Sequence, residues 1–305
     1  MESIRGFEDW VVRYSADIAH LFPDSLIKQA FSDVEFLPEI VQKDNNQAED
    51  NLAIWTYVNR ICTLESAKQG RDHLSFFKQD LNSIASSFGV SPSILMAIWC
   101  IETSYGQTRG GQKVLSTLAT LAYDGRRRDF FKSELMAALT ILQSKSVNPE
   151  DFLGSWAGAM GHTQFMPSSY LNHAVDYDRD GVADIWSENP IDALASTAAY
   201  LKKNGWDGTI PWGFQITFDD SFNYALAEPK IFKTVSNWAK IGINSRIQNK
   251  NLMGSIIIPT GAAGPKFLTT KNFDVLKTYN RSTSYALGVA LLSDLIDGQD
   301  ASSLS

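Results

Sequence analysis

The sequence predicts a mainly α-helical protein that carries a small β-rich insertion. Two observations support this fold class. Apolar residues recur at helical spacing over most of residues 7–206, and the pattern changes at 207 to short β-branched runs separated by turns. A helical pattern returns near the end of the chain. We therefore divide the chain into a helical region (1–88), a core (89–206), a β-rich insertion (207–272) and a C-terminal helix (273–305).

The N-terminal region has the spacing of amphipathic helices. Phe7, Trp10, Val11 and Tyr14 follow a 3, 1, 3 spacing, and residues 52–66 show a similar pattern. The sequences "FPDS" (22–25) and "FLPE" (36–39) carry turn signals between the helical segments. Residues 1–88 are thus expected to form several short helices.

A different kind of helix is expected in "GVSPSILMAIWCIE", residues 89–102. Ser91 is a suitable N-cap, and Pro92 stands at the first helical position, where its missing N–H costs nothing. The apolar residues that follow occupy every side of the helix, which is typical of a helix buried all round. The run ends in one carboxylate, Glu102.

The remaining elements follow in order along the chain. Residues 113–144 predict two helices with a break at "YDGRRRDFF", and 189–206 predict a helix closed by Gly205. The glycine-rich stretch 154–170 predicts a loop and a short helix. The expected strands are "FQITF", "GSIIIP" and "KFLTT", and the expected C-terminal helix is "SYALGVALLSDLI".

Composition excludes some classes of protein. Of the 305 residues 20% are charged and 44% hydrophobic, as in ordinary globular proteins, and the net charge of −7 argues against nucleic-acid binding. Cys62 and Cys100 are expected to be free thiols, with a disulfide as the alternative. There is no 18-residue apolar stretch and no signal peptide. The protein is either cytoplasmic as written or has lost a leader.

Glu102 is the first candidate for chemistry. A carboxylate at the end of a buried helix is ion-paired, hydrogen-bonded or held with a raised pKa, because desolvation favours its protonated form. A protonated acid near neutral pH can donate to a leaving oxygen, as in glycoside cleavage. The alternative is a structural acid bonded to backbone amides.

The second candidate is "GSWAGAMGHTQFMPSSY", residues 154–170. Its glycines allow close backbone approach, Gln164 supplies an amide that donates and accepts, and Phe165 and Met166 form an apolar floor. Sugars are bound by such mixtures of amides and apolar faces. In the alternative interpretation the glycines only allow helices to pack closely.

The third candidate is the acidic loop "DYDRDGVADIW", residues 176–186. Carboxylates at positions 1, 3 and 5, followed by glycine, match a calcium loop, but position 12 is Ser187, and Glu188 falls one residue later. A longer loop closed by Asp192 or Glu188 is therefore required, and a self-capped acidic turn is the alternative. The candidate metal ligands are Asp176, Asp178, Asp180, Val182 and Asp192.

Two other features of the sequence are weaker indications of function. The four histidines have no paired spacing, so no zinc site is predicted. The basic stretch "GRRRDFF" (125–131) is typical of a solvated helix start, with contact to an acidic substrate as the alternative.

Taken in order, these motifs resemble one enzyme family. "AIWCIETSYG", "VLSTLATLAYDGRRRDFF", "GSWAGAMGHTQFMPSSY", "DYDRDGVADIW", "DALASTAAYLKKNGW" and "YNRSTSYALGVALLSDLI" are similar to the membrane-bound lytic murein transglycosylase B family of bacterial cell-wall enzymes. "IVQKDNNQAED" also resembles its N-terminal part, so the resemblance spans nearly the whole chain.

This resemblance implies a fold and a site. The fold is a lysozyme-like core with a helical domain wrapped on it and a small β-rich insertion. Glu102 is then the sole catalytic acid, and Thr103 replaces a serine often found next to it. The family's acidic loop binds calcium in some members, so structural Ca²⁺ is the one ion expected and no cofactor is needed for chemistry. The residues expected to line the saccharide groove are Ser155, Gln164, Tyr200, Tyr279, Asn280 and Tyr285.

The resemblance also implies a reaction. Glu102 protonates the oxygen between N-acetylmuramic acid (MurNAc) and N-acetylglucosamine (GlcNAc), then accepts the proton of the C6 hydroxyl as a 1,6-anhydro ring closes. No second acid is needed, because the substrate's N-acetyl group stabilises the charge. The alternatives are a lysozyme-type hydrolase on the same fold and a non-catalytic peptidoglycan-binding module. Glycan strands are the expected partner, and other cell-wall enzymes are possible further partners. The expected location is periplasmic or outer-membrane-associated. The leader peptide is then expected to have been trimmed.

Overall fold

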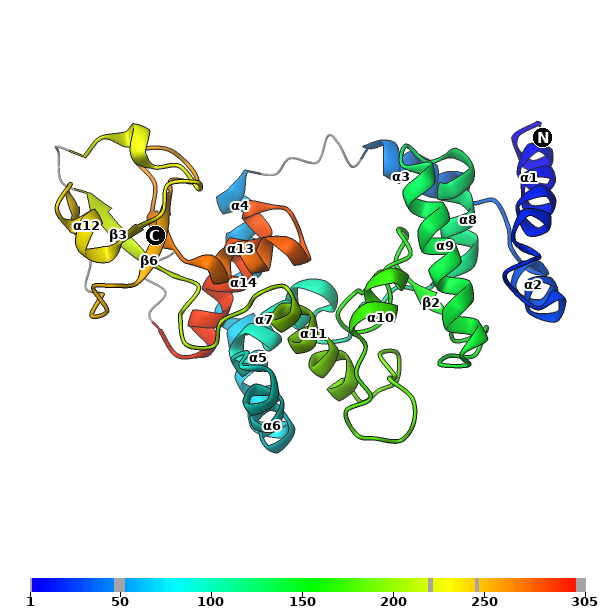
Figure 1. Cartoon of the computed structure of the whole chain (residues 1–305), viewed down its shortest axis with the longest axis horizontal. Helices are drawn as coiled ribbons and strands as arrows, with labels where there is room; N and C mark the ends of the chain where they lie inside the picture. Colours follow the sequence, from blue (N-terminus) through cyan, green and yellow to red (C-terminus); the bar gives the residue numbers. More distant parts are fainter. Residues whose placement is uncertain (1, 47–52, 219–221, 245–246, 300–305) are drawn as a thin grey trace. The chain divides into compact units, whose positions relative to one another are not determined.

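The computed structural model describes residues 2–46, 53–218, 222–244 and 247–299 (Figure 1). Within these ranges, side chains are described from residue 5 onwards. The described chain is mainly α-helical, as expected. It forms two compact units, each made of two separate segments: residues 1–51 with 102–197, and residues 52–101 with 198–305. The finer division at residues 88, 206 and 272 stays a prediction.

The first unit is helical, with one small two-stranded sheet. Its elements are α1 (Glu2–Ile18), α2 (Asp24–Phe31), α3 (Pro38–Asn46), β1 (Gln112–Lys113), α8 (Val114–Asp124), α9 (Arg128–Gln143), β2 (Leu153–Gly154) and α10 (Pro167–His173), followed by the first part of α11 (Ile191–Lys203). The break between α8 and α9 falls in "YDGRRRDFF", as predicted. The strands β1 and β2 were not predicted from the sequence.

Helix α8 is the centre of the first unit. Every residue from Val114 to Ala122 is buried, and α8 packs along α9 (Figure 1). Two of its buried hydroxyls are hydrogen-bonded: Ser116 Oγ and Thr120 Oγ1 accept from the backbone N–H groups of Glu35 and Leu37. Buried polar groups need such partners, so the chain before α3 is fixed to α8.

The basic stretch 125–131 has a structural contact in this unit. The carboxylate of Asp44 in α3 is fully buried and accepts from the backbone N–H of Arg126 at 3.0 Å, and the Arg126 Nε lies 3.5 Å from it. A buried carboxylate needs such compensation. Part of the stretch thus fixes α3 instead of being solvated.

The second unit contains the other helices and a five-stranded sheet. Its elements are α4 (Ile54–Ile61), α5 (Leu64–Phe76), α6 (Lys78–Phe88), most of α7 (Pro92–Thr103), β3 (Gly213–Phe218), a 3₁₀ turn (Tyr224–Leu226), β4 (Lys233–Thr234), α12 (Val235–Ala239), β5 (Ile243–Asn244), β6 (Met253–Ile257), β7 (Lys266–Thr269), α13 (Lys271–Tyr279) and α14 (Thr283–Ile296), with the end of α11.

Helix α7 agrees with its sequence. It begins at Pro92 and ends one residue after Glu102, and all residues from Ser93 to Trp99 are buried. Cys62 is buried and Cys100 is half-buried, and the two do not form a disulfide. No single helix in the described chain is long and apolar enough to cross a bilayer. Helices α6 and α7 reach the necessary length and apolar composition only when they are taken together, and they are bent by 108° relative to each other.

The insertion is an antiparallel sheet in the order β4-β6-β7-β3-β5. β3, β6 and β7 are the three predicted strands. The buried indole of Trp238 fills its core, and its Nε1 donates to Gly254 O at 2.8 Å. Trp238 lies on α12, so the sequence interpretation of residues 207–272 as strands and turns missed a helical turn.

The C-terminal segment also differs from its prediction, because it contains two helices instead of one. α13 ends at Tyr279, Asn280 is extended, and Ser282 caps α14 by accepting from Tyr285 N at 3.3 Å. α14 packs on α4, α5 and α13.

Asp294 on α14 gives a pH prediction for the second unit. Burial raises the pKa of Asp294 from 3.8 to about 6, with Asp297 adding to it and the Trp212 Nε1 hydrogen bond opposing it. Because the folded pKa lies above the unfolded one, this group lowers stability progressively as the pH rises from about 4 to 6. Asp294→Asn keeps an acceptor for Trp212. We expect it to stabilise the protein by about 2 kcal/mol at pH 7 and not at pH 4, measured by thermal unfolding at both pH values; equal effects at both would contradict this origin.

Candidate functional site

Glu102 lies at the penultimate position of α7 and is half-buried. The buried run before it fixes the helix axis, so the position of its Cα is set by the core. The chain leaves α7 through Ser104, Tyr105 and Gly106, whose φ angles are 50°, 59° and 85°. Two consecutive non-glycine residues in the left-handed region are rare, and such backbone persists only where its surroundings hold it.

Thr103 supplies part of that support. Its side chain is fully buried, its Oγ1 donates to His162 O at 2.6 Å and accepts from Gly106 N at 3.0 Å. His162 belongs to the glycine-rich motif. The backbone directly after Glu102 is therefore hydrogen-bonded to the second sequence candidate, which the sequence alone could not place.

Gln164 is held in a defined orientation by the same motif. Its φ is 55°, and its Nε2 donates to Gly161 O at 3.0 Å and to Arg109 O at 3.2 Å. Both amide protons are thus engaged, and Oε1 has no donor among the described residues. The fixed amide offers a ligand one acceptor atom.

Ser155 is engaged in a turn of its own. Its Oγ accepts from Ala157 N at 3.3 Å and from Ala159 N at 3.1 Å. The motif then forms a short backbone pair between Met160 and Phe165, at 2.8 and 3.0 Å. Ser155 can still donate its own hydroxyl proton.

The tyrosines predicted for the groove form a cluster within the second unit. The rings of Tyr200 and Tyr279 have centroids 5.0 Å apart, and those of Tyr279 and Tyr285 are 6.3 Å apart and parallel within 3°. Tyr200 Oη donates to Thr278 O at 2.8 Å. Asn280 Oδ1 accepts from Ser282 N at 3.1 Å. The structure thus brings the three tyrosines together, and Asn280 follows Tyr279 in the chain. Glu102, Ser155 and Gln164 belong to the first unit.

The acidic loop gathers three of its carboxylates. Asp176, Asp178 and Asp192 each offer an oxygen within 4.8 Å of the others. Asp180 is outside this group, with its Oδ1 accepting from Val182 N at 2.9 Å, and Val182 O accepts from Asp184 N.

Asp192, one of the two candidates for closing the loop, is hydrogen-bonded to the loop backbone. It is 5% exposed and accepts from Tyr177 N and Asp184 N, both at 2.9 Å. Burial raises the pKa of Asp192, and these backbone bonds oppose the shift. Glu188, the other closing candidate, is an exposed side chain paired with Arg109. Three carboxylates around one point suit Ca²⁺, which prefers oxygen ligands.

Arg109 and His162 link the acidic loop to the glycine-rich motif, and sequence reasoning missed this role for both. Arg109 Nη1 donates to Trp186 O at 2.6 Å and Ser187 O at 2.8 Å. His162 Nε2 lies 2.7 Å from Ser187 O, so this nitrogen carries the proton. Burial lowers the pKa of His162, although the Ser187 carbonyl opposes the shift. No local signal reveals contacts over such sequence separations.

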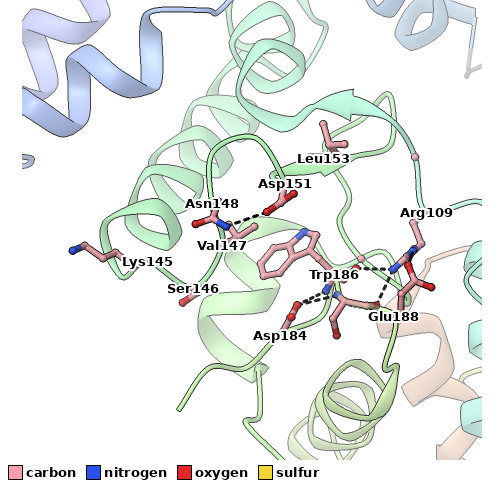
Figure 2. Close-up of a pocket in the computed structure, with 13 residues that line it drawn as sticks. Arg109, Lys145, Ser146, Val147, Asn148, Asp151, Leu153, Asp184, Trp186 and Glu188 are labelled. Carbon is pink, nitrogen blue, oxygen red and sulfur yellow. Dashed lines mark hydrogen bonds and ion pairs between the residues drawn. The ribbon is translucent and has the colours of Figure 1, made fainter. Parts of the chain in front are cut away.

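A cavity of about 560 Å³ lies beside these residues in the first unit (Figure 2). The indole of Trp186 stands in the middle of its lining in this view, between Asn148 and Asp151 on one side and Arg109 on the other. The sequence analysis did not find this cavity, because its walls come from four separate segments, 109–110, 145–153, 161 and 184–188.

Comparison with known proteins decides the family. A model described as the transglycosylase SLT domain matches residues 6–294. The chain belongs to this family. It is 30% identical over 292 residues to membrane-bound lytic murein transglycosylase B of Escherichia coli K12, covering 91% of this chain and 79% of that protein. The resemblance found in the sequence is thereby confirmed.

Solved structures of transglycosylases confirm the lysozyme-like fold class and the enzyme class. SltB3 of Pseudomonas aeruginosa in complex with NAG-NAM-pentapeptide has a TM-score of 0.92 and 37% identity, over 96% of this chain and 80% of that one. The Escherichia coli lytic transglycosylase Slt35 in complex with calcium has a TM-score of 0.81 and 28% identity, over 94% and 92%. The chain is thus an enzyme of the lytic transglycosylase class.

Proposed function

We propose that this transglycosylase cleaves the β-1,4 bond between MurNAc and GlcNAc in peptidoglycan and leaves a 1,6-anhydroMurNAc end. The observation that carries the proposal is the family match over residues 6–294. The relative SltB3 supports the substrate class, since it was solved with NAG-NAM-pentapeptide and, at a TM-score of 0.91 and 36% identity, with NAG-anhNAM-pentapeptide.

Glu102 is the single acid and base in this proposal. It donates its proton to the glycosidic oxygen as the bond breaks, and the N-acetyl carbonyl of the muramoyl residue stabilises the charge at the anomeric carbon. The Glu102 carboxylate then accepts the C6 hydroxyl proton while that oxygen closes the anhydro ring. The place of Glu102 at the end of a buried helix supports this role, because the packed helix holds the carboxyl group in a fixed position.

The residues proposed to hold the glycan differ in what they offer. Gln164 presents a fixed amide oxygen to a sugar hydroxyl or N-acetyl N–H, and Ser155 a hydroxyl proton. The tyrosines offer ring faces on which a pyranose can pack. The glycan-binding residues proposed are Ser155, Gln164, Tyr200, Tyr279, Asn280 and Tyr285.

Fragment release from purified sacculi tests the enzymatic part of the proposal. Soluble muropeptides should appear with time when sacculi are incubated with the purified chain. A chain that binds sacculi and releases nothing would instead be a binding module. We further propose that the protein acts in the periplasm or at the outer membrane, where its substrate lies; a fusion to a periplasm-specific reporter tests this.

We propose that the acidic loop holds a structural Ca²⁺ through Asp176, Asp178 and Asp192, with no role in the chemistry. The gathering of their oxygens within 4.8 Å and the burial of Asp192 support this set. The sequence candidates Asp180 and Val182 would contribute after a local rearrangement, since their oxygens are bonded within the loop.

Calcium should therefore stabilise the protein against heat. At a Ca²⁺ concentration about 100 times its dissociation constant, the gain is about 3 kcal/mol. Asp192→Asn should abolish the Ca²⁺-dependent rise in Tm, whereas Glu188→Gln should keep it, because Glu188 lies outside the carboxylate group. Loss of the rise in Glu188→Gln alone would show that the loop is closed by Glu188.

A further inference from the structure

The orientation of the Gln164 side-chain amide depends on two carbonyls from different parts of the chain. Gly161 O belongs to the same glycine-rich motif and accepts from Gln164 Nε2 at 3.0 Å. Arg109 O, 55 residues earlier, accepts from the same nitrogen at 3.2 Å. All three residues belong to the first unit. The direction in which Gln164 Oε1 faces a ligand is therefore set in part by the backbone at Arg109.

The segment 107–111 contains few other contacts that fix this backbone. It lies between α7 and β1 and is part of neither a helix nor a strand. Its residues are exposed except Arg109, which is half-buried, and Gly110 adds a close backbone approach to Gly154. Within the described chain, Arg109 is the one residue of the segment with a hydrogen-bonded side chain. The place of the Arg109 carbonyl thus depends on what holds the guanidinium of the same residue.

The guanidinium of Arg109 is held by the turn at residues 186–188 (Figure 2). Nη1 donates to Trp186 O at 2.6 Å and to Ser187 O at 2.8 Å, and Nη2 pairs with Glu188. The Arg109 side chain is 25% exposed, whereas that of Glu188 is 93% exposed. Because an ion pair that is open to solvent contributes little, the two carbonyls are the contacts that hold the guanidinium.

The turn at 186–188 is itself fixed by hydrogen bonds. Asp184 Oδ1 accepts from Trp186 N at 2.8 Å and from Ser187 N at 3.0 Å. Ser187 O also accepts from Nε2 of His162, a buried residue of the glycine-rich motif, at 2.7 Å. The contacts thus run from this motif through the turn and Arg109 to the Gln164 amide. Arg109 therefore meets two carbonyls in fixed positions.

We propose that Arg109 is a positioning residue for the glycan-binding site. Its guanidinium, held by the carbonyls of Trp186 and Ser187, places its own carbonyl where it fixes the amide of Gln164. Arg109 acts through Gln164 and does not touch the glycan. The inference rests on the proposed function, in which Gln164 Oε1 accepts from the glycan. Without the guanidinium, the amide would keep only Gly161 O as a fixed acceptor, and ordering it would reduce the affinity for the glycan.

Steady-state kinetics with soluble, uncross-linked peptidoglycan strands test this role. Arg109→Met keeps the bulk of the side chain without its donors. It should raise KM about fivefold and leave kcat unchanged, as when binding common to the ground and transition states is lost. Gln164→Leu should raise KM about tenfold, the effect of losing one good hydrogen bond. In the double variant KM should equal that of Gln164→Leu alone, because Arg109 then has no amide left to position.

Two further variants are controls for this experiment. Arg109→Lys keeps a charged donor for the carbonyls of the turn and should return KM to within about twofold of the wild-type value. Arg13→Met removes an exposed arginine from α1 and should leave KM and kcat unchanged. Independent effects multiply, so a double variant with KM raised about fiftyfold would overturn the proposal. A folded Arg109→Met with an unchanged KM, where Gln164→Leu raises it, would do the same.

The amide of Gln164 also gives a readout that does not depend on turnover. Its two protons, identified in NMR spectra by their absence in Gln164→Leu, should both exchange slowly with solvent in the wild type. In Arg109→Met one of them should exchange at least about tenfold faster. Unchanged exchange in Arg109→Met, or a wild-type proton that exchanges as in a free amide, would overturn the proposal. Faster exchange in Arg109→Met with an unchanged KM in Gln164→Leu would support the positioning role and count against the proposed glycan contact alone.

Discussion

Replacing Glu102 by Gln is expected to lower the rate of muropeptide release by at least about 10²-fold, and towards 10⁴-fold, the usual contribution of general acid–base catalysis. Gln keeps the shape and hydrogen-bonding capacity of Glu but can neither give up nor accept the proton. The proposed mechanism assigns both proton transfers to this one residue, and neither the glutamate motif nor the Gln164 motif contains a second acid. Release is measured as soluble fragments from sacculi per unit time.

The variant should fold normally. Glu102 is half-buried at the end of α7, and the helix is held by the buried residues from Ser93 to Trp99. Thermal unfolding should therefore match that of the wild type, and Glu39→Gln, an exposed acid on α3, serves as the matched control with full activity. Normal activity of folded Glu102→Gln would show that another group moves the proton.

Gly161→Ala is expected to lower the stability of the protein strongly. Among the glycines of the glycine-rich motif at which an added Cβ would meet backbone atoms, we expect its effect to be the largest. Gly161 has a φ of 70°, and an added Cβ would lie against Ile185 O and 2.9 Å from Ile185 Cγ1. Left-handed backbone costs an Ala about 1–2 kcal/mol, and overpacking adds about 1–3 kcal/mol. The sum is about 3 kcal/mol, measured by urea unfolding.

Gly205→Ala separates the two contributions. Gly205 has a φ of 97°, but nothing lies within 4 Å of an added Cβ, so only the conformational cost remains. Gly161→Ala should also impair activity, because Gly161 O positions Gln164 and the neighbouring His162 O positions Thr103. Equal destabilisation in the two variants would contradict the close packing of the motif on Ile185.

The sequence predicted those elements whose signals are local. Ser91 and Pro92 marked the start of α7, and its uniformly apolar residues indicated burial. Gly205, predicted to close the helix over 189–206, has a φ of 97° and lies two residues after Lys203, the last residue of α11. The strands of the insertion followed from their β-branched runs. The break between α13 and α14 also had a local signal, because the polar residues 280–283 favour a turn. The apolar residues on both sides of this stretch made a single helix look plausible.

What could not be predicted depends on contacts distant in sequence. Arg109 meets Glu188 across 79 residues, and Thr103 meets His162 across 59. The cavity around Trp186 combines four segments in the same way. Side-chain types restrict such contacts only weakly, since arginine and histidine have many available partners. The proposal of Asp192 instead of Glu188 as closing ligand likewise depends on a distant contact, the ion pair between Glu188 and Arg109.

The mass of the released muropeptides tests the central claim most directly. Sacculi are digested with the purified chain, and the products are compared by mass spectrometry with those of a hydrolase that cuts the same bond. Transglycosylation consumes no water, so each muramoyl end should be lighter by one water than its hydrolytic counterpart. Products with the mass of the hydrolysed ends would contradict the account, and would assign Glu102 to a lysozyme-type reaction.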